Sequence, residues 1–393
     1  MKLNYKHTIY ACFIGYIVQA IVVNFAPLLF LTFQATYGIP LSKITFLVTV
    51  NFVLQLTIDF LSAGFVDRIG YRTSAILAHI FAAAGLIALT ILPELTADPF
   101  VGLLIAVLIY AVGGGLIEVL TSPMVEACPT DNKEKAMSLL HSFYSWGQLG
   151  VVLLSTLFFV TVGIGHWKIL AVLWALVPIC NIFLFARVPI MTLLAEDEKG
   201  LTRKDLFTTK TFWILLILMM CSGASELAVA QWASAYAEAG LGVSKTVGDL
   251  AGPMFFALTM GIARTIYGKY GERMKLESFM LGSGILCVFS YLLISLSPIP
   301  ILGLLGCGIC GFSVGILWPG TLSMASARIK NGGTLMFAML ALGGDLGCTL
   351  GPTVVGKVAA AFGDSLNTGI LVALIFPILL LVGIVLCRLD KKE

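Results

Sequence analysis

The stretch AGFVDRIGYR, residues 63–72, joins two long apolar segments and decides how the rest of the chain is interpreted. Each neighbouring segment is long enough to cross a bilayer, which takes about 20 apolar residues. A related stretch, GKYGERMK, occupies residues 268–275, so that Asp67-Arg68 matches Glu272-Arg273 at an offset of 205 residues. Two similar charged loops between apolar segments indicate an internal duplication of a membrane-embedded unit.

Composition agrees with a membrane protein. The 393 residues are 59% hydrophobic and only 11% charged, with a mean hydropathy of +1.00, whereas a soluble domain is about 45–50% apolar and about 25% charged. These values exclude a disordered chain, a collagen-like repeat and a secreted disulfide scaffold. Eight of the nine cysteines lie within apolar runs, so we expect neither a metal site nor a cofactor.

Twelve segments are long and apolar enough to span the membrane. They cover approximately residues 8–32, 43–65, 72–92, 100–124, 135–161, 167–187, 211–237, 246–268, 276–296, 299–325, 333–360 and 366–388. The fold class is therefore an all-α membrane protein with twelve transmembrane helices in two pseudo-symmetric six-helix bundles. Expected domains are 1–187, a cytoplasmic linker over 188–210, and 211–393.

The distribution of Lys and Arg predicts the orientation. With a cytoplasmic N-terminus, nineteen Lys and Arg residues fall in inner loops, whereas the outer loops keep only Lys43, Lys168 and Lys245. Cytoplasmic loops of membrane proteins carry this excess of positive charge. We expect a multi-pass protein of the cell membrane with both termini in the cytoplasm, and we expect a monomer.

A second pair of matching segments lies in the fifth and eleventh spans, where residues 147–150 match residues 344–347 at an offset of 197. Duplicated six-helix halves are typical of secondary transporters, which bind substrate near the midplane between the halves. The sequence has no phosphate-binding loop of the form G-x-x-x-x-G-K-[ST], so direct use of ATP is not expected.

The loop at residues 63–72 resembles the signature loop of the major facilitator superfamily, G-x-x-x-D-[RK]-x-G-[RK]-[RK]. Asp67, Arg68, Gly70 and Arg72 match it, while Ala63 and Tyr71 depart from it. The twelve spans, the linker and the second copy of the loop are similar to the same superfamily over the whole chain. The resemblance implies transport by alternating access.

Shorter segments resemble the fucose–proton symporter family. They are GGGLIEVLTSP at 113–123, LLHSFYSWG at 139–147, and residues 223–236 with their glutamate at 226. Ser122 replaces the family's Asn before the proline, and span one carries Gln19 and Asn24 where the family tends to have an acid. The resemblance implies sugar–proton symport, and the missing acid departs from the family's usual proton-coupling arrangement.

Two glutamates inside predicted spans are the candidates for proton coupling, Glu118 and Glu226. An ionisable group at the centre of a bilayer costs at least about 2.5–3.5 kcal/mol, so it indicates a function by default. The alternative for Glu226 is a fixed hydrogen bond to a neighbouring helix. The alternative for Glu118 is a structural pair with a cation such as Arg264.

Polar and aromatic side chains within the spans are the candidate substrate contacts. His141, Tyr144 and Gln148 recur at i, i+3 and i+7, which places them on one helical face. Such a face offers donors, acceptors and a ring surface to sugar hydroxyls. The expected substrate-binding residues are Gln19, Asn24, His141, Tyr144, Gln148, Trp232, Trp318 and Asp345. Packing remains the alternative for the tryptophans and for Asp345.

Charged residues near the cytoplasmic ends of spans are candidates for gating. Asn51, Gln55 and Asp59 form one stripe of span two, and the repeat relates Asp59 to Arg264 in span eight. The expected gating residues are Asp59, Asp67, Arg68, Arg72, Arg264, Glu272 and Arg273. The alternative for the loop charges is that they only set the topology.

The sequence therefore predicts a secondary transporter rather than an enzyme, importing a small neutral polyhydroxylated solute with protons. The expected partners are this solute, protons and the lipid bilayer, and no nucleic acid. One alternative is a proton-driven exporter of drugs or hydrophobic metabolites. Exporters of this kind carry G-x-x-x-G-P in span five, whereas here the pattern occupies residues 347–352 in span eleven. A solute receptor that does not transport is the second alternative.

Overall fold

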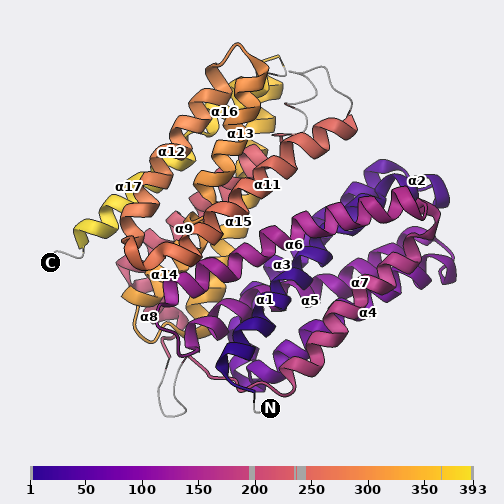
Figure 1. The fold of residues 1–393 in the computed structure, drawn as a ribbon, viewed down its shortest axis with the longest axis horizontal. Helices are drawn as coiled ribbons and strands as arrows, with labels where there is room; N and C mark the ends of the chain where they lie inside the picture. The colour runs from indigo at the N-terminus through magenta and orange to yellow at the C-terminus, as the bar shows by residue number, and fades with distance from the viewer. Residues whose placement is uncertain (1–2, 194–199, 234–235, 237–244, 364, 391–393) are drawn as a thin grey trace. The chain divides into compact units, whose positions relative to one another are not determined.

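The computed structural model describes residues 3–193, 200–233, 236, 245–363 and 365–390, and for a few of them, Asp67 included, it describes the backbone alone. Every element labelled in Figure 1 is a helix, and the described residues contain no strand. Ten of the described helices are long and apolar enough to cross a membrane, and α3 holds a further apolar helical stretch, Thr49–Ser62. Residues 194–199 of the predicted linker and residues 234, 235 and 237 of the predicted seventh span lie outside the described residues.

Unit 1 is one of two compact units, and it consists of Met1–Pro129, Phe143–Asp197 and Gly333–Ala338. Its elements are α1 (Tyr5–Asn24), η1 (Ala26–Leu29), α2 (Phe30–Tyr37), α3 (Leu41–Ile69), α4 (Tyr71–Leu95), α5 (Pro99–Ala127), most of α6 (Lys133–Thr161), η2 (Ile164–His166) and α7 (Trp167–Phe185).

The helix α5 packs against α1, α3 and α4. Glycines make the contact with α4 close, because a Cβ added at Gly113 would lie 2.6 Å from the carbonyl oxygen of Ala78. Lipid supplies no hydrophobic drive for association, so membrane helices associate through such small-residue contacts. The position of α5, and of any polar side chain on it, therefore depends on its glycines.

Unit 2 consists of Thr130–Ser142, Glu198–Gly332 and Met339–Glu393. Its elements are the start of α6, then α8 (Arg203–Thr208), α9 (Lys210–Ala230), α11 (Lys245–Tyr270), η3 (Gly271–Arg273), α12 (Leu276–Leu296), α13 (Pro300–Val314), α14 (Leu317–Arg328), most of α15 (Gly333–Ala361), α16 (Leu366–Ala373) and α17 (Ile375–Asp390).

Glycines also join α9 to α15 within unit 2. A Cβ added at Gly347 would lie 1.9 Å from the carbonyl oxygen of Met220, and one at Gly351 would lie 2.3 Å from that of Ala224. The Gly347-to-Pro352 pattern, which the sequence analysis compares with an exporter motif, therefore brings two helix backbones into contact.

Each of the twelve predicted spans contains a helix, and four of the spans are interrupted within the described residues. The first span breaks after α1, just before Pro27, the seventh after α9 at residues 231–232, the tenth between α13 and α14, and the twelfth between α16 and α17. Proline lacks the N–H that bonds the carbonyl four residues earlier, and its ring clashes with that carbonyl. Pro319 stands four residues after Gly315, and Pro377 four residues after Ala373, so the breaks in the tenth and twelfth spans have this cause.

Each unit includes the beginning of a helix whose remainder belongs to the other unit. The start of α6, through Ser142, belongs to unit 2, and the start of α15, through Ala338, belongs to unit 1. In unit 2, Lys135 forms an ion pair with Glu272. In unit 1, the hydroxyls of Tyr71 and Thr334 form a hydrogen bond. The domain limits at residues 187 and 211 stay a prediction.

Candidate functional site

Glu118 lies half-buried on α5, and its partner comes from α1. The Gln19 side-chain Nε2 donates a hydrogen bond to Glu118 Oε2 at 3.1 Å, and only 4% of the Gln19 surface is exposed. The contact between α1 and α5 brings the two side chains together. The structure therefore groups one predicted proton-coupling residue with one predicted substrate-binding residue.

Hydroxyl groups extend this cluster along the same two helices. The Tyr16 and Ser122 hydroxyls lie 3.3 Å apart, and the ring of Tyr144 meets that of Tyr16 edge to face, with centroids 6.3 Å apart. Tyr16 stands three residues before Gln19, and Ser122 four residues after Glu118. Helical spacing from the two predicted residues could therefore have identified both hydroxyls, which the sequence analysis did not name as site residues.

Two other predicted contacts lie on the same helices of unit 1. Asn24, at the end of α1, donates from Nδ2 to its own helix at the Ala20 carbonyl, 2.9 Å away. Gln148 is half-buried on α6, next to Gly147, where an added Cβ would lie 3.0 Å from the Ala20 side chain. Their role in binding stays a prediction.

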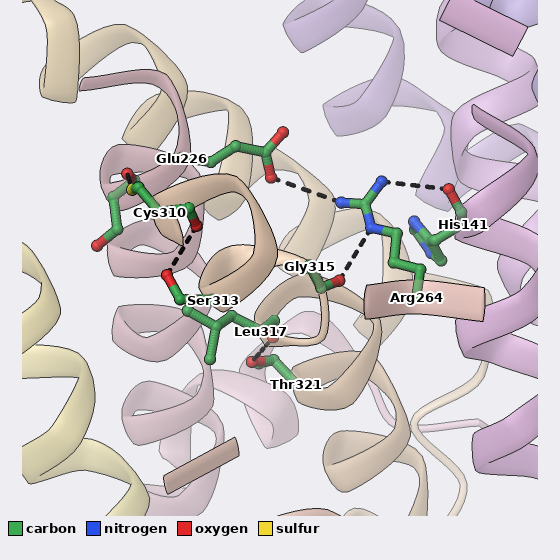
Figure 2. Close-up of polar contacts among 9 residues, drawn as sticks. His141, Glu226, Arg264, Cys310, Ser313, Gly315, Leu317 and Thr321 are labelled. Atoms are coloured by element: carbon green, nitrogen blue, oxygen red, sulfur yellow. Dashed lines mark hydrogen bonds and ion pairs between the residues drawn. The ribbon is translucent and has the colours of Figure 1, made fainter. Parts of the chain in front are cut away.

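In unit 2, Glu226 on α9 faces a buried cation. Its Oε2 lies 3.5 Å from Arg264 Nη2 on α11, and the two side chains are 15% and 4% exposed. Figure 2 shows the guanidinium between this carboxylate and two backbone carbonyls. The cation that the sequence analysis considered as a structural partner for Glu118 therefore pairs with Glu226.

One of the two carbonyls around Arg264 lies on α6 and the other at the break between α13 and α14. Arg264 Nη1 donates to the His141 carbonyl at 3.1 Å, and Nε donates to the Gly315 carbonyl at 2.9 Å. Gly315 is the residue whose carbonyl cannot receive a helical bond from Pro319, so the proline creates the acceptor that Arg264 uses. His141 contributes its backbone carbonyl to this site and its side chain is buried, and the expected contact of that side chain with substrate stays a prediction.

The two predicted tryptophans pack against glycines of α15. A Cβ added at Gly344 would lie 2.2 Å from the ring of Trp318, and one at Gly356 would lie 2.8 Å from that of Trp232. Trp232 Nε1 also donates to the Pro352 carbonyl at 3.1 Å. Asp345, beside Gly344, is half-buried. Both indoles have a clear packing role, and their contact with substrate stays a prediction.

The predicted gating residues of unit 1 lie at the ends of α3 and α4. Arg72 donates from its two terminal nitrogens to the carbonyls of Phe185 and Val188, at 2.8 and 2.9 Å. It therefore satisfies one carbonyl at the C-terminus of α7 and one just beyond it. Arg68 is exposed and Asp59 is fully buried, whereas the side chain of Asp67 lies outside the described part of the chain.

The predicted gating residues of unit 2 lie in η3, next to the start of α6. The hydrogen bond and the positive charge of Lys135 lower the pKa of the Glu272 carboxyl, whereas Arg273 is exposed. Two further bonds join α6 to α11, since Tyr267 donates to Glu134 at 2.9 Å and Ser138 donates to the Arg264 carbonyl at 2.8 Å. The sequence analysis named neither Lys135 nor Tyr267 for this contact.

The described residues include no group of three or more His, Cys, Asp and Glu side chains that could hold a metal ion. Their polar clusters are carboxyl, amide, hydroxyl and guanidinium groups, which bind solutes and protons by hydrogen bonds and charge.

The model of the Major Facilitator Superfamily matches residues 11–352. The chain belongs to this superfamily. No curated protein sequence matches the chain, so the likeness to individual members comes from solved structures. Major facilitator proteins are transporters, and the chain is a multi-pass membrane transporter and not an enzyme.

Several solved major facilitator structures share the fold. The fucose:proton symporter FucP of E. coli, in an outward conformation, superposes with a TM-score of 0.83 at 14% identity, covering 98% of this chain and 99% of FucP. The proton:xylose symporter XylE gives 0.79 at 12% identity, covering 96% and 94%. The human organic anion transporter MFSD10 gives 0.73 at 16%, covering 96% and 99%. At these identities the likeness shows the fold alone.

Proposed function

We propose that the protein imports a small neutral polyhydroxylated solute, a monosaccharide, together with protons. The observation that carries this proposal is the cluster around Glu118 in unit 1, where a carboxyl group contacts the Gln19 amide beside the Tyr16 and Ser122 hydroxyls. Amides and hydroxyls both donate and accept, which suits the hydroxyls of a sugar. The carboxyl group can also take up a proton within the membrane, as in proton relays of transporters.

The two glutamates have different parts in this proposal. Glu118 takes up and releases the proton that accompanies the solute, because its hydrogen-bond donor is a neutral amide that can serve either protonation state. Glu226 lies beside Arg264, which balances its negative charge. Glu226 therefore stays a coupling candidate whose ionised form is supported by its surroundings.

Two further considerations support the class of substrate and the orientation. Two proteins with this fold, FucP and XylE, are described as sugar–proton symporters, the activity proposed here. The excess of Lys and Arg on one side of the predicted topology supports a cell-membrane protein with both termini in the cytoplasm. We further propose that one chain is the transporting unit.

The test is uptake of labelled sugars into proteoliposomes, with and without an inward proton gradient. The panel contains hexoses, fucose and xylose, and the proteins are the wild type, Glu118→Gln, Glu226→Gln and Glu94→Gln. Glu94 is the matched control, because it is an exposed glutamate paired with Lys168. We expect the gradient to stimulate uptake of one sugar in the wild type and the Glu94 variant.

Loss of the proton response in Glu118→Gln, with retained exchange of unlabelled for labelled sugar, supports symport through Glu118. A wild-type protein that moves no sugar under any gradient contradicts the proposed substrate. Export assays with lipophilic compounds then test the competing exporter function.

A further inference from the structure

We propose that Gln19, Gln55 and Gly114 form a subsite for a single hydroxyl group of the transported solute. This inference rests on the proposed function, since it assigns the recognition of one substrate hydroxyl to unit 1. Gln55 and Gly114 are new to the site, because the sequence analysis placed Gln55 only on a polar stripe of span two.

The three residues meet at one point inside unit 1. A Cβ added at Gly114, on α5, would lie 2.9 Å from Gln19 Oε1 on α1 and 3.0 Å from Gln55 Nε2 on α3. The two side chains are 4% and 3% exposed. Thus an amide oxygen and an amide nitrogen from two different helices face the same glycine, and the side chain of any larger residue there would crowd both of them.

Both of these amide atoms are buried without a hydrogen-bond partner among the described residues. A polar group buried in a membrane protein is costly unless a partner satisfies it. The orphan pair consists of one acceptor and one donor. A hydroxyl group matches both at once, because it donates its hydrogen to Gln19 Oε1 and accepts from Gln55 Nε2 on an oxygen lone pair.

Glu118 sets the direction of the Gln19 amide. Because Gln19 Nε2 donates to Glu118 Oε2 at 3.1 Å, the oxygen of the same amide is the end that faces Gly114. The carboxyl group proposed to carry the proton is therefore one hydrogen bond away from the hydroxyl subsite. This arrangement places proton binding and recognition of a solute hydroxyl on the two ends of a single side chain.

A water molecule offers the same hydrogen bonds as a solute hydroxyl, so the test must separate the two. The experiment measures competition with uptake of the transported sugar by each of its monodeoxy analogues, in proteoliposomes. If the subsite binds a solute hydroxyl, one analogue competes about tenfold more weakly than the parent sugar. This is the change in affinity expected for one lost hydrogen bond. In the Gln55→Leu variant the parent sugar binds more weakly by the same factor. The parent and the discriminated analogue then bind equally well.

Asn51→Leu is the matched control. Asn51 lies one turn before Gln55 on the same stripe of α3 and is equally buried, at 6% exposed. Its replacement makes the same chemical change away from Gly114, so we expect the preference for the parent sugar to persist. Gly114→Ala is the second test variant, because its methyl group would lie 2.9 and 3.0 Å from the two amide atoms, and crowding them apart removes the preference while both glutamines stay in the sequence.

The proposal is overturned if no monodeoxy analogue is discriminated by the wild type, which is the result for a subsite that holds only water. It is also overturned if the preference survives in both Gln55→Leu and Gly114→Ala. Gln55→Asn, which withdraws the amide by one methylene, replaces Gln55→Leu if that variant does not yield a monodisperse protein. A wild type that transports none of the sugars contradicts the proposed function itself, and this result differs from transport without discrimination.

Discussion

The surroundings of Glu118 in unit 1 and of Glu226 in unit 2 differ in the charge of the partner. Glu118 accepts a hydrogen bond from the neutral amide of Gln19, whereas Glu226 lies 3.5 Å from the guanidinium of Arg264. Both glutamates are inside the membrane-spanning part of the chain. The same residue type thus contacts a neutral amide in one unit and a guanidinium in the other.

In the proposed function, this difference separates a structural use of a buried charge from a chemical one. Arg264 also binds the carbonyls of His141 and Gly315, so the ion pair is part of a junction of α6, α9, α11 and the break after α13. Removing one partner of a buried pair leaves the other charge uncompensated. The amide at Glu118 tolerates loss of the charge, so Glu118 is better suited to bind and release a proton.

The largest expected effect comes from breaking the ion pair. Glu226→Gln leaves the Arg264 charge without its carboxylate, and we expect a loss of about 3 kcal/mol in the free energy of unfolding, the lower end of the range for buried pairs because Glu226 is partly exposed. The measurement is denaturant unfolding of the purified protein in detergent.

The double variant Glu226→Gln/Arg264→Met checks the cause. It removes both charges, so its loss in the free energy of unfolding should be smaller than the sum of the losses measured for Arg264→Met and Glu226→Gln separately. Strictly additive effects would show that the two side chains do not interact, and the comparison with Glu118 would lose its basis.

The next effect concerns the helix that carries Glu226. Gly347→Ala places a methyl group 1.9 Å from the Met220 carbonyl oxygen on α9, so the helices must separate, at a cost of about 1–3 kcal/mol. Gly282→Ala on α12 is the matched control, because an added Cβ there meets nothing within 4 Å. Melting temperatures in detergent should fall for the first variant and stay the same or rise for the second. Equal melting temperatures would contradict the close helix contact.

A smaller effect on stability is expected at Glu118. Glu118→Gln keeps an acceptor oxygen for Gln19 Nε2, so the free energy of unfolding should change by less than about 1 kcal/mol. Measured beside Glu226→Gln in the same detergent, this variant sharpens the contrast between the two sites. A loss as large as that of Glu226→Gln would mean that Glu118 is also held in a structural charge pair.

The smallest effect is at the exposed contact between the start of α6 and η3. The Lys135 hydrogen bond and charge lower the pKa of Glu272 in the folded protein. The contribution of Glu272 to stability is therefore complete above the usual glutamate pKa of about 4.3 and is lost as the pH falls through the lowered value. Added salt should weaken it, as for other exposed pairs.

The measurement is the melting temperature between pH 7 and pH 3 for the wild type and Glu272→Gln. Subtracting the two curves isolates this carboxyl group, and the difference should shrink toward low pH. A difference that does not depend on pH would contradict the assignment. The Tyr71–Thr334 contact of unit 1 joins two hydroxyls, so Tyr71→Phe should show no such pH dependence.

The sequence predicted several parts of both sites from local information. Glu118, Glu226 and Arg264 stand out because they are ionisable residues within apolar segments. Gln19 stands out as a polar residue at the position where related transporters tend to have an acid. The choice of partners could not be predicted in this way. Arg264 was considered for Glu118 and pairs with Glu226, and the His141 carbonyl is a further partner of Arg264.

The sequence by itself determined the membrane-spanning segments and the duplication, because hydropathy and repeat spacing are properties of the chain that need no tertiary contact. Only the tertiary structure decided that Gln19 meets Glu118, that Gln55 faces Gly114, and that the carbonyl released by Pro319 receives Arg264. The physical reason is that these partners lie on different helices. Their contact depends on the rotation and depth of each helix, which close packing at glycines sets and which no single segment encodes.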